Sequence, residues 1–207
     1  MRISFDCNKM RGAVAPLVFI SAVAISSTAM SADDNGKFAI KGGGLQTCEN
    51  FVETMREQTN DVALYGGWIE GFVTAQNQHI DATFDVAPWQ TTNTLLRLTK
   101  SICEQAKPDT RFIDAFAGVF RILFPSRITQ EDEVVGVSNG EAHSIAYREI
   151  LKRVQQVLRD EGYTIADETG TFDNVTVRQL MDYQTKKGLV PTGLPDQPTL
   201  YPLFFKK

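Results

Sequence analysis

The chain has 207 residues, of which 43% are hydrophobic and 22% charged, with 21 basic and 25 acidic side chains. The net charge of −4 and the lack of a basic run exclude a typical nucleic-acid-binding protein, whose affinity depends on neutralising phosphates. A chain of this length is expected to form one large domain or two small ones.

Residues 1–32 have the order of segments that characterises a secretory signal peptide. Three basic residues precede an apolar run at residues 13–25, and the small residues SSTAMSA follow it. A membrane-spanning helix needs about 20 apolar residues, so this run is short for one. We therefore predict cleavage between residues 29 and 32, a periplasmic or secreted location, and no membrane segment in the mature chain. An uncleaved anchor or a buried core helix is the alternative. Removal of residues 1–32 changes the net charge from −4 to −6.

Two cysteines, Cys48 and Cys103, remain after the predicted cleavage. An even pair in an oxidising compartment favours a disulfide, which would stabilise the fold by about 4 kcal/mol through the closed loop. A metal or redox site is the alternative, but the chain has no CxxC motif and only two histidines. We predict a disulfide, no metal and no cofactor.

Residues 33–127 are predicted to form a helical domain. Apolar residues recur at helical intervals in four stretches, at residues 45–55, 65–72, 95–103 and 112–123. Each cysteine falls on the apolar face of its helix, so the disulfide is expected to join the first helix to the third.

Residues 128–143 mix acidic residues with Gly and Ser and show no sustained period, which predicts a solvated linker. The helical period returns with Ile150, Leu151, Val154 and Leu158 and stops at Gly162, where a left-handed helix cap favours glycine. The second domain is therefore predicted at residues 144–207. Reduction of the disulfide is expected to destabilise the first domain and to spare the second.

The second domain contains the pattern Gly-x-x-Asp-x-x-Thr twice. Its members are Gly170, Asp173 and Thr176 in the first copy, and Gly193, Asp196 and Thr199 in the second. Asp is a favoured helix N-cap, glycine permits a sharp turn before the helix, and Thr falls at the third helical position. Each copy thus predicts a helix start, which gives the second domain three helices and the whole chain an all-α fold.

Four segments around these motifs carry a resemblance: VQQVLRDEGY, GTFDNVT, LMDYQTKKGLVPTG and the final D-x-x-TL. They resemble the three-helix peptidoglycan-binding domain, over about residues 147–205, with Pro195 and Pro202 as departures. The resemblance implies a wall ligand, peptidoglycan or a muropeptide, lying near the helix starts, where free N–H groups attract carboxylates. The expected contacts are Phe172, Asn174, Tyr183 and Gln184, with a core position as the alternative for Tyr183. A purely structural role for the six motif residues is the alternative.

The segment YGGWIEGFVTAQN at residues 65–77, with Cys103 and Pro108 downstream, loosely resembles the acid-stress chaperone HdeA and periplasmic immunity proteins of the same architecture. This resemblance implies an interaction role and a periplasmic protein partner for the first domain.

Reactive groups for catalysis are scarce. A zinc amidase needs three protein ligands, usually including histidine, but only His79 and His143 are present. A muramidase needs a carboxylic acid in a pocket that raises its pKa, and Glu70, with Trp68 and Phe72 nearby, is the candidate. A solvent-facing role for Glu70 is the simpler interpretation. The sequence thus predicts an exported, non-enzymatic wall-binding protein, with a cell-wall hydrolase or an immunity-type or chaperone-like interaction protein as alternatives.

Overall fold

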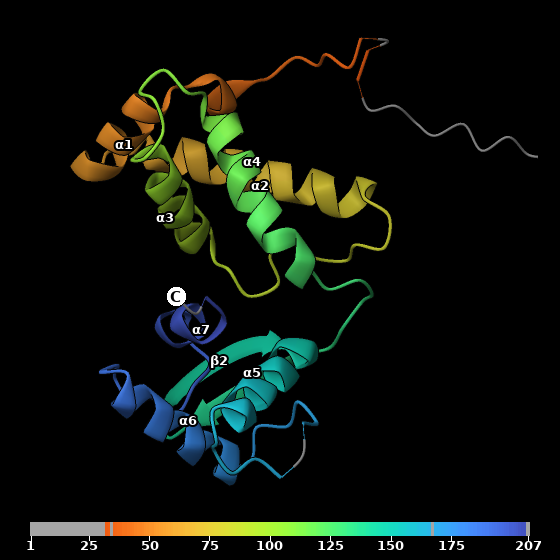
Figure 1. Cartoon of the computed structure of the whole chain (residues 1–207), viewed down its shortest axis with the longest axis vertical. Coiled ribbons are helices and arrows are strands. Elements are labelled where there is room, and N and C mark those ends of the chain that lie inside the picture. The colour runs from red at the N-terminus through yellow and green to blue at the C-terminus, as the bar shows by residue number, and fades with distance from the viewer. Residues whose placement is uncertain (1–31, 34, 167, 206–207) are drawn as a thin grey trace, which may run out of the picture. The chain divides into compact units, whose positions relative to one another are not determined.

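The computed structural model describes residues 32–33, 35–166 and 168–205, so the predicted signal peptide lies outside the described residues except for Ala32. Within this described part, the chain forms seven α-helices, two short 3-10 helices and one two-stranded sheet (Figure 1). Residues 40–207 make up one compact unit. None of the helices described combines the length and the apolarity that crossing a bilayer requires.

The four helices expected in the first half are present, as α1 (Cys48–Glu57), α2 (Val62–His79), α3 (Thr92–Cys103) and α4 (Phe112–Leu123). A 3-10 helix, η1 (Gly42–Leu45), precedes them. Figure 1 shows the four helices grouped together, and α3 packs against each of the other three. At the centre, the Phe51 ring lies 4.8 Å from the Tyr65 ring and 4.7 Å from the Phe112 ring, measured between centroids.

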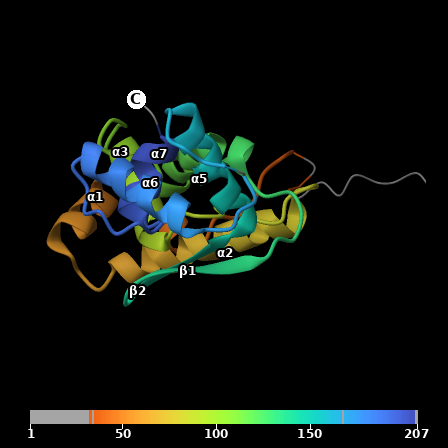
Figure 2. The same ribbon diagram turned by 90° about the horizontal axis from the view of Figure 1, so that it is seen from below.

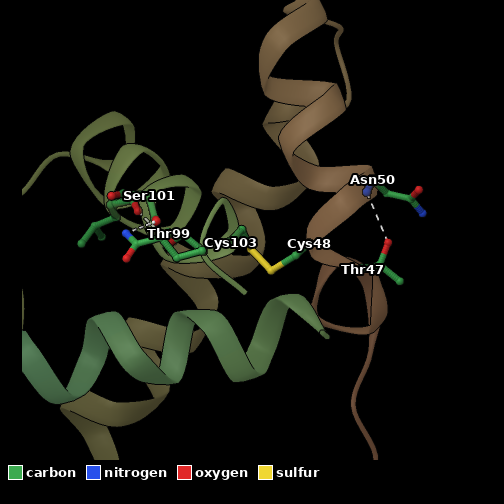
Figure 3. The surroundings of a disulfide bond; sticks show 8 residues. Thr47, Cys48, Asn50, Thr99, Ser101 and Cys103 are labelled. Carbon is green, nitrogen blue, oxygen red and sulfur yellow. Dashed lines mark hydrogen bonds between the residues drawn. A yellow bond between two sulfur atoms is a disulfide. The ribbon is translucent and has the colours of Figure 1, made fainter. Parts of the chain in front are cut away.

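The predicted disulfide between Cys48 and Cys103 is confirmed (Figure 3). It joins the first residue of α1 to the last residue of α3, and both cysteines are at most 4% exposed. Thr47 caps α1 beside the disulfide, because its hydroxyl accepts a hydrogen bond from the Asn50 amide at 3.2 Å. The disulfide therefore fixes two helix ends against the aromatic core.

The prediction of a strictly all-α fold is wrong at residues 134–147, which include part of the predicted linker. A 3-10 helix, η2 (Phe124–Ser126), is followed by an antiparallel hairpin of β1 (Val134–Asn139) and β2 (Ala142–Tyr147) (Figure 2). Gly140, at φ +61°, begins its two-residue turn. Val137 is 2% exposed and packs with Leu151 and Leu194, so burial of this side chain holds the hairpin to the helices that follow.

The second half contains the three expected helices, α5 (Arg148–Asp160), α6 (Asn174–Lys186) and α7 (Gln197–Phe204). Helix α5 packs against α6, α7 and β2. The fully buried side chains of this part include Ile150, Val154, Leu158, Leu180 and Tyr183. The apolar stripe of α5 thus faces the other two helices, as its period predicts.

Helix α7 also contacts the loop between α2 and α3. The Trp89 ring from this loop lies 5.6 Å from each of the Phe204 and Phe205 rings. The Gln197 amide group donates to the Trp89 carbonyl, and its carbonyl oxygen accepts from the Thr91 amide at 3.2 Å. Trp89 and Ile128 consequently share one buried cluster with residues of α5, α6 and α7.

Candidate functional site

The first Gly-x-x-Asp-x-x-Thr copy forms the loop that leads into α6. Asp173 is the N-cap, and its carboxylate accepts a hydrogen bond from the Thr176 amide at 2.7 Å. A buried glutamine on α5 supports the loop: the Gln155 carbonyl oxygen accepts from the Gly170 amide at 2.8 Å. The Gln155 amide group donates to the Thr176 hydroxyl at 3.3 Å, which links Gly, Gln, Thr and Asp into one hydrogen-bonded chain.

The second copy repeats this arrangement before α7. Asp196 is the N-cap and accepts from the Thr199 amide at 3.0 Å. Gln184 on α6 accepts from the Gly193 amide at 2.8 Å and donates to the Thr199 hydroxyl at 2.7 Å. The Thr199 hydroxyl in turn donates to the Asp196 carboxylate. The motif is therefore repeated because each helix start is held by the same network from the preceding helix.

The glycines of both copies meet two requirements that a larger residue would not. Gly170 has φ +73° and Gly193 has φ +67°, a backbone region that side chains disfavour. A Cβ on Gly170 would lie 2.7 Å from the Arg148 carbonyl oxygen, and one on Gly193 would lie 2.7 Å from a Val177 methyl carbon. The loops thus pass close to a neighbouring helix at the position of the glycine.

The helix starts are occupied by carboxylates. Hydrogen bonds from the Thr176 amide and hydroxyl lower the pKa of Asp173. Burial opposes them, and the Val175 amide and the charge of Arg178 add smaller lowering contributions. Asp173 therefore remains ionised at neutral pH and uses N–H groups that a ligand carboxylate would need. Binding of a ligand carboxylate to these N–H groups is therefore unfavourable at the start of α6. It is equally unfavourable at the start of α7, where the Asp196 carboxylate accepts from the Thr199 amide.

The four residues expected to contact a ligand lie in two different environments. Phe172 is half-buried and Asn174 is exposed, side by side at the start of α6. Tyr183 and Gln184 are each 0% exposed, so a ligand on the surface cannot reach them. Their expected role needs correction: both belong to the core, Tyr183 as packing and Gln184 as the support of the second loop.

The Tyr183 hydroxyl is buried and has no hydrogen-bond partner among the described residues. Burial, followed by the nearby Glu161 and Tyr163, raises the pKa of Tyr183 to about 12. The charged end of Lys187 lies 5.4 Å from the centre of its ring. This side chain thus acts as a large apolar residue with an unsatisfied polar end.

Sequence reasoning missed the part played by Gln155. It is 1% exposed and lies among the apolar residues of α5 that the helical period identifies, where a polar residue is unusual. Along the sequence, the supporting glutamine precedes the glycine by 15 residues in the first copy and by 9 in the second. The glutamine therefore has no constant spacing from the motif. The sequence signal that could have identified this role was the position of a polar residue, Gln155, within the apolar stripe of α5.

Residues 148–203 match the family model described as a putative peptidoglycan binding domain. The match extends from the first residue of α5 to Leu203 in α7 and includes both loop networks. The second half of the chain thus contains a peptidoglycan-binding-like domain, as the sequence resemblance implied. No curated protein and no solved structure matches the chain. The resemblance of the first half to HdeA and immunity proteins gains no support from these comparisons.

The residues considered for catalysis lie outside this domain or at its edge. His79, at the end of α2, and His143, on β2, are both exposed. Within the described part of the chain, no cluster of three or more His, Cys, Asp or Glu side chains could hold a metal ion. Glu70 is exposed on α2, where its carboxylate accepts a hydrogen bond from the Thr92 hydroxyl at 2.5 Å.

Proposed function

We propose that this chain is an exported, non-enzymatic protein that binds cell-wall peptidoglycan through its peptidoglycan-binding-like domain and thereby keeps its helical first half at the wall. The observation that carries the proposal is the family match over residues 148–203, which coincides with three helices and two intact loop networks.

Phe172 and Asn174 are the ligand-contact candidates that remain on the surface of the domain. They adjoin Asp173 at the start of α6, so they can offer an apolar ring face and a carboxamide. These groups suit the neutral parts of a glycan, namely sugar ring faces and acetamido groups. The wall would then raise the effective concentration of the first half near any partner held there.

The non-enzymatic part of the proposal rests on the surroundings of Glu70. A glycoside hydrolase needs a general acid enclosed in a pocket that keeps it protonated. Glu70 is exposed and hydrogen-bonded to a hydroxyl on the neighbouring helix, which does not provide such an enclosure. Incubation of the protein with purified sacculi should therefore release no soluble muropeptides. Release that is lost in Glu70→Gln would support the hydrolase alternative.

The binding proposal is tested by sedimentation of the chain from residue 33 onward with purified sacculi. We expect the protein in the pellet, and in the supernatant when the sacculi have first been digested to soluble fragments. Asn174→Ala should reduce the pelleted fraction, whereas Asn60→Ala, at an exposed asparagine just before α2, should not. Recovery of all wild-type protein in the supernatant would contradict the proposal.

A further inference from the structure

A groove lies between α3 and α7, away from the loop that leads into α6. It has a volume of about 530 Å³ and is lined by Asn93, Arg97 and Leu98 from α3 and by Gln197, Pro198 and Tyr201 from α7. We call it the α3–α7 groove. Gln197 forms part of its wall while it is hydrogen-bonded to the start of α3, so the two sides of the groove are held together.

The α3 side of the groove offers polar groups without partners. Arg97 is exposed, and among the described residues its side chain has neither an ion pair nor a hydrogen bond. Asn93 lies one helical turn before Arg97 and is also exposed, and its side chain likewise has no hydrogen bond within the described part. A guanidinium group binds a carboxylate through two parallel hydrogen bonds, and a carboxamide nearby can add a third.

The α7 side offers an apolar and aromatic surface. Tyr201 is 46% exposed, and its ring packs against the Phe205 ring at 5.2 Å between centroids. Phe205 is in turn packed on Trp89 at 5.6 Å, so the exposed ring stands on a fixed base. Pro198 beside it adds a second rigid apolar face. A ring of this kind suits a sugar face or the apolar part of a peptide.

We propose that the α3–α7 groove binds the carboxylate-bearing part of a peptidoglycan fragment, with Arg97 and Asn93 on the carboxylate and Tyr201 on the adjoining apolar surface. The inference rests on the proposed wall binding and extends it to a site shared by both halves of the chain. It also accounts for the carboxylates of the wall, which the aspartate-headed starts of α6 and α7 would repel.

The test compares Arg97→Gln with Arg121→Gln in the chain from residue 33 onward. Arg121 is also an exposed arginine whose side chain has no partner in the described part, but it lies on α4 outside the groove. Binding of a soluble disaccharide muropeptide should be about tenfold weaker in Arg97→Gln, as expected for one charge-assisted contact, and unchanged in Arg121→Gln. The difference between them should shrink as salt is added.

Comparison of the muropeptide with two simpler ligands identifies the chemical group that the α3–α7 groove binds. The free stem peptide should bind with the same dependence on Arg97, whereas a neutral N-acetylglucosamine oligomer should show none. Equal muropeptide affinity of Arg97→Gln and the wild type, while the wild type still sediments with sacculi, would overturn the groove assignment and leave the proposed function standing. If the wild type fails to sediment with sacculi, the proposed function itself is overturned, and this assignment with it.

Discussion

Tyr183 shows how far a single side chain can differ from the role that its sequence context suggests. The resemblance to a binding domain makes it an expected ligand contact, but it is fully buried, and its hydroxyl has no partner among the residues that the structure describes. A buried polar group without a partner costs about 1–3 kcal/mol. The hydroxyl therefore lowers the stability of the fold, and the ring contributes through packing alone.

Replacement of this residue, Tyr183→Phe, should raise the free energy of unfolding by about 1 kcal/mol at neutral pH, because it removes the unsatisfied hydroxyl and keeps the ring. At alkaline pH the gain should increase. Since the folded state raises the pKa of Tyr183 to about 12, ionisation of the unfolded chain above pH of about 10 favours unfolding of the wild type. Urea titrations at pH 7 and pH 10.5 measure both effects. A variant less stable than the wild type would reveal a partner for the hydroxyl.

At the scale of secondary-structure elements, the helices of this chain follow from local sequence and the hairpin does not. Apolar stripes, Asp N-caps and glycine turns act within a few residues of one another, so they predict the seven α-helices found in the described residues. The hairpin had a local signal too, Asn139-Gly140 between a valine-rich segment and a segment with Ile145 and Tyr147, but the acidic residues and glycines of residues 128–143 favoured a linker. The supporting roles of Gln155 and Gln184 depend on which helices pack together, which no local pattern contains.

The N-cap of α6, Asp173, gives a prediction in which two substitutions behave differently. Asp173→Ala removes the cap of α6 and should lower the free energy of unfolding at pH 7 by about 1 kcal/mol. Asp173→Asn can still accept the Thr176 amide hydrogen and should remain close to the wild type at pH 7.

In acid, the wild type should lose the contribution of this cap while Asp173→Asn keeps its own. The folded state lowers the pKa of Asp173 below its ordinary value of 3.8, so the stabilisation is complete above that pH and is lost as the pH falls through the lowered pKa. Urea titrations at pH 7 and pH 3 compare the three proteins. A constant difference between wild type and Asp173→Asn at both pH values would argue against the capping role of the charge.

At the scale of the whole molecule, the sequence predicts two units joined by a solvated linker, and the contacts of residues 40–207 point to stronger coupling. Trp89 lies between α2 and α3, and Ile128 lies just after η2. Both are nevertheless at most 8% exposed and belong to the buried cluster of α5, α6 and α7. Such pairing of distant segments depends on the shape of both surfaces, so composition alone could not predict it. The domain boundaries themselves remain a prediction.

Coupling of this kind changes what reduction of the disulfide between Cys48 and Cys103 should do. Loss of a loop closure over 55 residues should lower the free energy of unfolding by about 4 kcal/mol. If the halves were independent, hydrogen exchange would accelerate only in the first half. Because α7 is joined to the α2–α3 loop by Trp89 and Gln197, we expect amide protection to fall at Leu180 in α6 as well as at Leu96 in α3. A double variant with both cysteines changed to alanine should reproduce the reduced state. Full protection at Leu180 alongside loss at Leu96 would mean that the halves unfold separately and that the α3–α7 contact is too weak to couple them.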